Sequence, residues 1–267
     1  MKSINLNLKR PLLTLAAAIA VTTASASSTN STPNWGTDIL HYFVHDHFTN
    51  NGVVPDASAV VDLQFKSQGH AENQKFDLIA KDLAPATTYT LLSWDKGETN
   101  FTEAAQFTTD ANGNIRLKFK ANSNAAKSNG NGHGNQSLPE ALDPLINLGS
   151  IAIVDVNTQA VLQADLGSPD KLQYLVKRKL EGGGAAALLF IQGTLKKTHF
   201  RLQTVHLAPT NDYWLAINET VVQTNRSDAM GNLKINALTA PIGSPLDIQK
   251  VQLLDTSTNV LLSTELP

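Results

Sequence analysis

Residues 76–91, Phe-Asp-Leu-Ile-Ala-Lys-Asp-Leu-Ala-Pro-Ala-Thr-Thr-Tyr-Thr-Leu, return 124 positions later as residues 200–215, Phe-Arg-Leu-Gln-Thr-Val-His-Leu-Ala-Pro-Thr-Asn-Asp-Tyr-Trp-Leu. Seven of these sixteen positions are identical, and they include Pro85 and Pro209 and also Tyr89 and Tyr213. Self-similarity at a fixed spacing is the signature of a duplicated structural unit. The sequence therefore predicts two copies of one fold in a single chain.

Two further blocks align in the same order at smaller offsets. Residues 109–115 match residues 227–233 at an offset of 118, and residues 151–162 match residues 251–262 at an offset of 100. A shrinking offset indicates insertions in the first copy. The longer insertion contains a polar, Gly- and Asn-rich stretch without periodicity, which predicts a disordered loop at about residues 122–137.

Short apolar runs alternate with polar residues through both copies, as in Val61, Leu63 and Phe65. Alternation with a period of two, interrupted by Gly, Asn, Asp and Pro, is typical of half-buried strands. We expect an all-β fold with two tandem antiparallel β-sandwich modules, at residues 57–168 and 169–267.

The run Leu83-Ala-Pro-Ala-Thr-Thr-Tyr89 resembles the corner before the penultimate strands of fibronectin type III modules. In that family the tyrosine hydroxyl bonds back to the backbone and pins the turn. Residues 207–213 keep Leu, Pro and Tyr but carry Asn211 in place of the threonine, and no early-strand tryptophan matches. The resemblance implies immunoglobulin-like sandwiches with Tyr89 and Tyr213 as structural corner residues. Such a fold does not by itself carry a function.

The first 26 residues predict a secretory signal peptide. A positive start is followed by an apolar stretch, Leu12–Val21, and by the small-residue cleavage site Ala24-Ser25-Ala26. We therefore expect an exported protein of the periplasm, cell surface or medium. The chain has no cysteine, so no disulfide or thiol chemistry is available to it.

The net charge of the chain excludes some classes of binding partner. Removing the signal leaves 18 Lys and Arg against 23 Asp and Glu, a net charge of −5. That balance predicts no nucleic-acid partner and no polybasic membrane patch, and no later segment is apolar enough for membrane insertion of the mature chain.

Residues 27–56 are predicted to form an N-terminal linker and a capping helix. Ile39, Leu40, Phe43, Val44 and Phe48 recur at helical spacing, and a helix would place Asp38, His41 and His45 side by side. Imidazoles four residues apart on a helix can share an ion, so this facet is a candidate zinc or copper site. The alternative is a surface helix with polar histidines.

No other catalytic or cofactor motif stands out. Trp94 and Trp214 are candidate ligand-binding residues, because an exposed tryptophan can stack on a sugar or anchor a partner; filling the sandwich is the alternative. We therefore expect a non-enzymatic structural, adhesive or ligand-binding protein of the envelope or matrix, without a cofactor, whose partners are proteins or polysaccharides. The alternatives are a metal-binding envelope protein that uses the N-terminal histidine pair and a hydrolase with its site at the module junction.

Overall fold

The computed structural model describes residues 34–98, 100–122, 136–236, 238 and 244–266. The predicted signal peptide, residues 1–26, and most of the predicted loop at 122–137 lie outside the described residues. Residues 34–267 form one compact unit.

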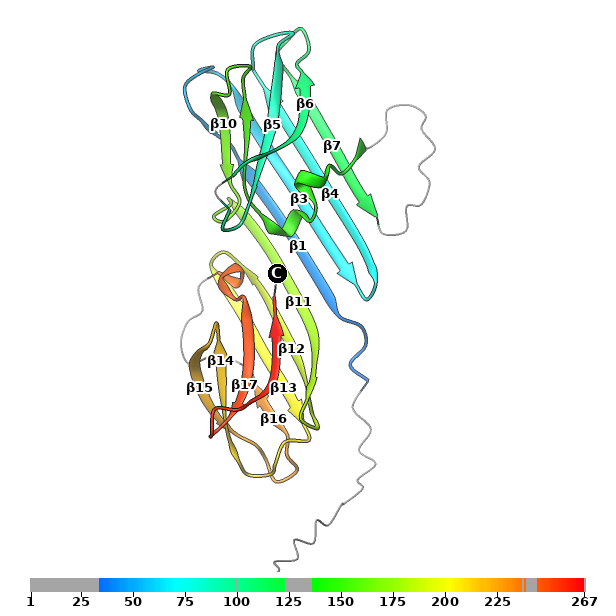
Figure 1. Ribbon diagram of the computed structural model, residues 1–267, viewed down its shortest axis with the longest axis vertical. Helices are drawn as coiled ribbons and strands as arrows, with labels where there is room; N and C mark the ends of the chain where they lie inside the picture. The colour runs from blue at the N-terminus through cyan, green and yellow to red at the C-terminus, as the bar shows by residue number, and fades with distance from the viewer. Residues whose placement is uncertain (1–33, 99, 123–135, 237, 239–243, 267) are drawn as a thin grey trace, which may run out of the picture. The chain divides into compact units, whose positions relative to one another are not determined.

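The described chain is almost entirely β-structure, arranged in three sheets (Figure 1). The largest sheet has nine strands, in the order β16 (Leu233–Ile235), β13 (Lys197–Val205), β12 (Ala185–Thr194), β11 (Lys171–Gly182), β1 (Ile39–His47), β3 (Ser58–Gln68), β4 (Ala71–Lys81), β7 (Ile115–Asn122) and β8 (Gln136–Ser137). All of its pairings are antiparallel except that of β8 with β7, which is parallel.

Two smaller antiparallel sheets cover the large one. The five-stranded sheet has the order β2 (Thr49–Asn50), β10 (Ala160–Asp165), β9 (Leu148–Val154), β5 (Thr88–Asp95) and β6 (Thr102–Thr108). The four-stranded sheet has the order β15 (Thr220–Arg226), β14 (Asp212–Ile217), β17 (Lys250–Asp255) and β18 (Val260–Glu265). Figure 1 shows the first lying over β3, β4 and β7 and the second over β12 and β13.

The only helical segments among the described residues are three-residue 3₁₀ turns, and none can span a bilayer. They are η1 (Glu140–Leu142), η2 (Leu145–Asn147) and η3 (Pro245–Asp247).

Burial follows strand alternation, as the sequence predicts. In β3 the side chains of Val61, Leu63 and Phe65 are buried, while the residues between them face solvent. Most of the buried apolar side chains form one continuous cluster that draws on both copies, and a small second cluster contains Leu92, Ala152 and Val154. The result is a sandwich-like all-β fold in which one face of every sheet is covered and the other is open.

The helix predicted at the N-terminus is wrong. Residues 39–47 form strand β1, in which Leu40, Tyr42 and Val44 are buried on one side and His41 and His45 lie on the other. Apolar residues at 39, 40, 43 and 44 fit the helical period, and those at 40, 42 and 44 fit the strand period, so local pattern alone could not decide. The strand is favoured because β1 pairs along both of its edges, with β3 and with β11.

Strand pairing reproduces the sequence repeat. Tyr89 pairs with Phe107 in the first copy, and Tyr213 pairs with Asn225 in the second, at the offsets of 124 and 118 found in the sequence. The β-bulge after Leu91 recurs after Leu215. The two copies therefore agree down to their irregularities.

The structure extends the repeat to strands that the sequence comparison did not align. From the centre of the nine-stranded sheet, the strands follow in the order β1, β3, β4 and β7 toward one edge. They follow in the order β11, β12, β13 and β16 toward the other edge. β1 and β11 therefore occupy equivalent places, and they pair with each other antiparallel. An approximate two-fold axis passes through the directly paired Tyr42 and Tyr174.

The tyrosine corner forms in both copies, although its place in the fold differs from the expected one. The Tyr89 hydroxyl accepts a hydrogen bond from the Ala84 amide at 3.1 Å, and the Tyr213 hydroxyl donates to the Ala208 carbonyl at 3.2 Å. Both tyrosines lie at the point where the chain passes from the large sheet to the smaller one, at the start of β5 and β14, and not before a penultimate strand. In each copy, the hydrogen bond of the tyrosine hydroxyl fixes the connection between the two sheets.

In each copy a glycine packs closely against the backbone of the turn that contains this tyrosine corner. Gly113 has φ +78°, and a Cβ there would lie 2.0 Å from the Leu83 carbonyl oxygen. Gly231 has φ +77°, and its Cβ would lie 2.1 Å from the Leu207 oxygen. The glycine carbonyls accept hydrogen bonds from the Leu83 and Leu207 amides, so the close approach is part of the turn.

We expect Gly113→Ala and Gly231→Ala each to destabilise the protein more than Gly97→Ala does. Gly97 also has positive φ, at +81°, but nothing lies within 4 Å of its Cβ position, so it isolates the cost of conformation, about 1 kcal/mol. The clash should add about 1–3 kcal/mol at the other two sites. Urea unfolding monitored by fluorescence measures the difference, and equal losses at all three positions would contradict the close packing.

Candidate binding surface

The outer face of the nine-stranded sheet is the face turned away from the two smaller sheets, and it is strongly basic. Strand alternation places on it more than half of the chain's 21 Lys and Arg residues. They are Lys66, Lys75, Lys81, Arg116, Lys118, Lys120, Lys171, Lys177, Lys179, Lys197, Arg201 and Lys234.

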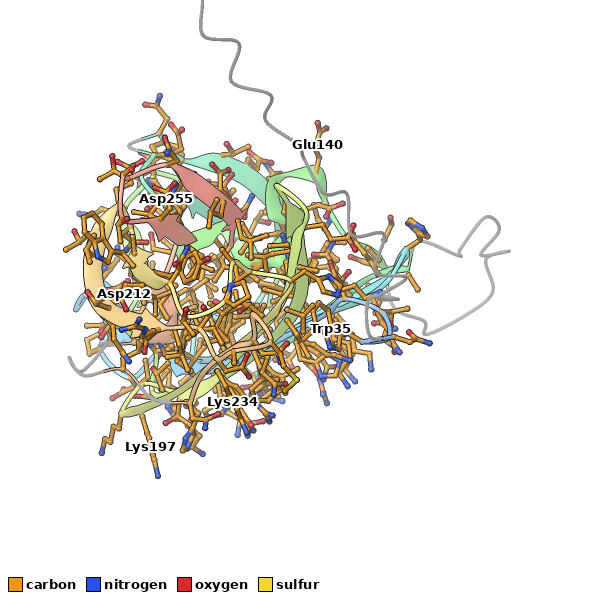
Figure 2. The ribbon with its side chains drawn as sticks, turned by 90° about the horizontal axis from the view of Figure 1, so that it is seen from below. Trp35, Glu140, Lys197, Asp212, Lys234 and Asp255 are labelled. Atoms are coloured by element: carbon orange, nitrogen blue, oxygen red, sulfur yellow. The ribbon has the colours of Figure 1, made fainter. Side chains whose placement is uncertain are left out.

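Acidic residues are almost excluded from this basic face. Of the 23 Asp and Glu residues, only Asp62, Asp77 and Glu181 occupy outward positions on the strands of the nine-stranded sheet that the structure describes. Figure 2 shows the separation: Lys197 and Lys234 project from one side of the molecule, and Asp255 and Glu140 lie on the opposite side. The charges of an acidic chain are thus divided between faces.

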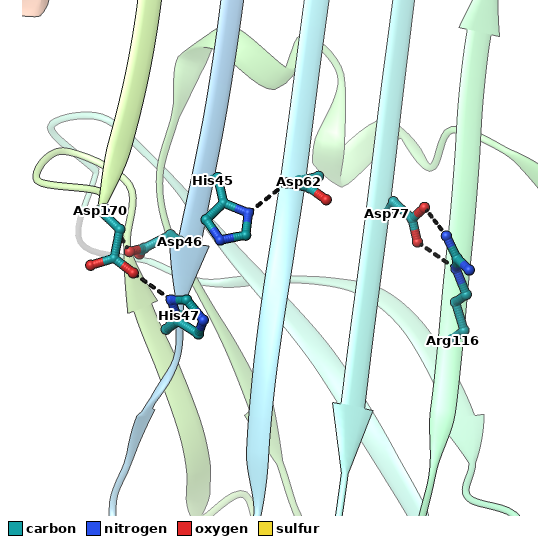
Figure 3. Close-up of polar contacts among 7 residues, drawn as sticks. All are labelled: His45, Asp46, His47, Asp62, Asp77, Arg116 and Asp170. Carbon is teal, nitrogen blue, oxygen red and sulfur yellow. Dashed lines mark hydrogen bonds and ion pairs between the residues drawn. The ribbon is translucent and has the colours of Figure 1, made fainter. Parts of the chain in front are cut away.

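Two of the three carboxylates on the basic face already have cationic or imidazole partners (Figure 3). Asp77 accepts two hydrogen bonds from Arg116, at 2.9 and 2.6 Å, and these bonds raise the pKa of the exposed Arg116 guanidinium. His45 Nδ1 lies 2.8 Å from Asp62 Oδ1. The ion pair of Asp77 with Arg116 offsets one of the three negative charges and leaves most of the lysines available.

At the rim of the face, β1 contacts the start of β11 (Figure 3). His47 Nδ1 lies 2.5 Å from Asp170 Oδ2, and this hydrogen bond lowers the pKa of the Asp170 carboxyl. The Asp170 amide donates to the Asp46 carboxylate at 3.0 Å, while burial raises the pKa of Asp46. The contacts fix the end of the β1–β11 ladder.

A groove of about 720 Å³ lies on the basic face where the two copies join. Its side chains come from β1, β3, β11, β12 and β13, and they include the cations Lys66 and Lys197, the imidazoles of His41 and His199, and the half-buried ring of Phe43. The groove therefore carries polar and basic groups on a surface that is more apolar than polar.

Tyr42 and Tyr174 underlie the groove and turn their rings inward. The Tyr42 ring lies 5.9 Å from the Lys96 ammonium, which belongs to the segment after β5. Neither tyrosine hydroxyl has a hydrogen-bond partner among the described residues, and burial raises both pKa values, that of Tyr174 to about 12. The β1–β11 joint is thus closed on its inner side.

The proposed metal facet is not assembled. In an extended strand His41 and His45 stand about 13 Å apart along the chain, too far for both to bind one ion. Asp38 lies before β1 and accepts a hydrogen bond from the Lys179 amide at 2.9 Å. No group of three or more His, Asp or Glu residues in the described part of the chain is placed to hold a metal ion.

The tryptophans lie away from the basic face. Trp94 on β5 and Trp214 on β14 are half-buried on the outer faces of the two smaller sheets. Trp94 packs beside Leu92, Ala152 and Val154, and its ring meets Phe101 edge-on at 5.7 Å. Their role as ligand-binding residues stays a prediction.

The residues of the basic face and groove were missed by sequence reasoning. The signal was present in the strand alternation: the basic residues of β7 and β13 stand at every second or fourth position, as in Lys118 and Lys120 or Lys197 and Arg201. Net charge averages over both faces and hides this pattern.

Comparison with known proteins adds no assignment: no protein-family model, curated protein or solved structure matches this chain.

We expect zinc affinity to be unchanged when His41 and His45 are both replaced by Ala, because strand β1 holds the two imidazoles apart. Calorimetric titration of the mature chain and of the double variant measures this. A clear loss of zinc binding in the variant would show that the two residues share an ion.

Proposed function

We propose that this protein is an exported, non-enzymatic binding protein of the cell envelope or extracellular matrix that holds a polyanion on its basic face. The observation that carries the proposal is the segregation of charge. A mature chain expected to carry a net charge of −5 presents one sheet face with many cations and three carboxylates.

Segregation of this kind opposes stability. Lys75 and Lys120 are directly opposite each other on β4 and β7, and Lys177 and Lys179 follow one another on the same face of β11. Like charges directly opposite across a strand pair are destabilising. Local violations of this kind concentrate at functional sites, where a ligand supplies the compensating interaction.

A continuous cationic face attracts polyanions by releasing their counterions and by its summed field. The net-charge argument against such partners therefore does not apply to this face. The predicted signal peptide supports an extracytoplasmic polyanion, and among the expected partners this favours an envelope or matrix polysaccharide.

We also propose that each copy is an immunoglobulin-like module, at residues 57–168 and 169–267. In the first copy β3, β4 and β7 form one layer, and β10, β9, β5 and β6 form the other. The first, second and fifth strands then oppose the seventh, sixth and third, as in immunoglobulin-like sandwiches, while the fourth strand pairs with the third instead of the fifth. β1 and β11 are additional strands beside the first strand of each module.

We expect Lys179→Gln/Lys234→Gln to weaken binding to dextran sulfate by on the order of tenfold at low salt, since each lysine near an anionic surface contributes about 1 kcal/mol. Arg226→Gln/Lys250→Gln is the matched control, because it removes the same charge from residues outside the basic face. Biolayer interferometry over a salt series measures both.

Equal weakening in the two variants would show that net charge, and not this face, governs binding. Absence of binding by the wild-type chain to dextran sulfate and to inorganic polyphosphate at low salt would remove the proposed function.

A further inference from the structure

The groove at the joint is lined by two rows of side chains that run across the strands. Strand registers define them. The first row is Gln64, Phe43, Gln173, Thr194 and Lys197, and the second is Lys66, His41, Leu175, Gln192 and His199. Adjacent members stand about 4.8 Å apart, the spacing of neighbouring strands, so each row extends about 19 Å.

The approximate two-fold axis relates four of the five members of each row to members of the other. It exchanges Gln64 with Gln192, and Phe43 with Leu175, as the equivalent registers of β1–β3 and β11–β12 require. The first row has two carboxamides, one apolar side chain in the floor and Lys197 at its end; the second has one carboxamide, one apolar side chain in the floor and Lys66 at its end. Two similar half-sites in succession suit a ligand that itself repeats.

The side chains of the two rows indicate more about the expected ligand than that it is negatively charged. Three carboxamides and the Thr194 hydroxyl each donate and accept hydrogen bonds, which matches a ligand rich in hydroxyl groups. Lys66 and Lys197 match anionic groups spaced along it. The half-buried Phe43 ring offers an apolar patch for a C–H surface.

We propose that the groove binds a segment of an acidic polysaccharide, with the carboxamides on its hydroxyl groups and the cations on its anionic groups. The proposal rests on the proposed function, since it names the ligand class of that same face. A membrane surface fits less well, because none of the large apolar side chains that the described structure leaves exposed lies on this face. They are Val53, Phe101, Val156, Val221, Met230 and Val260.

The test separates hydroxyl recognition from charge. The groove variant is Gln64→Ala/Gln192→Ala, which keeps every charge, and the control is Gln68→Ala/Gln203→Ala, which removes carboxamides from the same face outside the groove. Each mature chain is titrated calorimetrically with a galacturonate decamer and with inorganic polyphosphate of matched charge, and thermal unfolding checks that each variant is folded.

We expect wild type to bind the galacturonate decamer more tightly than polyphosphate. The groove variant should lose about tenfold in decamer affinity, the loss appropriate to two neutral hydrogen bonds, and should keep its polyphosphate affinity within about twofold. The control variant should match wild type with both probes.

Other outcomes overturn the inference at different levels. Equal affinities of wild type for the two probes, or an unchanged decamer affinity in the groove variant, would leave a polyanion-binding face without sugar recognition. Tight binding to vesicles of anionic phospholipid with no decamer binding would assign the face to a membrane. No binding to either polyanion would remove the proposed function along with the inference.

Discussion

The antiparallel ladder between β1 and β11 is the interaction on which the rest of the structure depends. Each copy alone would end its larger sheet in an unpaired strand, and such edges are templates for aggregation. Pairing the two edges with each other satisfies their backbone groups and merges a four-stranded and a five-stranded layer into one sheet. The joint brings Tyr42 and Tyr174 together without partners for their hydroxyls, at a cost of about 1–3 kcal/mol each. The ladder must outweigh that cost, and it does so over seven paired positions.

The ladder also creates the basic face. Either copy by itself presents a few strands with a modest cluster of lysines. Joined edge to edge, the copies present a single surface wide enough for an extended polymer, and the groove lies on the seam between them. The proposed binding surface is therefore a property of the pair and of neither copy alone.

Repeat analysis of the sequence predicted the strand content and which segments of the two copies are equivalent, because offsets of 124, 118 and 100 reappear in the pairing of β5 with β6 and β14 with β15 and of their neighbours. It could not predict β1, since Leu40, Phe43 and Val44 satisfy the helical period and Leu40, Tyr42 and Val44 satisfy the strand period, and the partner strand β11 is about 130 residues away. The site was beyond reach for a related reason. Whether Lys66 and Lys197 lie together depends on which edges of the two copies meet, and no local pattern records that.

The arrangement is that of an isologous dimer contained in one polypeptide. Two separate identical chains would form a seam whose halves must be the same, and a directional polymer would fit it equally well in either orientation. In a single chain the two halves can differ in sequence, and here they do. The approximate two-fold axis relates His41 to Gln173 and Lys66 to Thr194. One end of the seam therefore differs chemically from the other, and the proposed polysaccharide would have a preferred orientation along it.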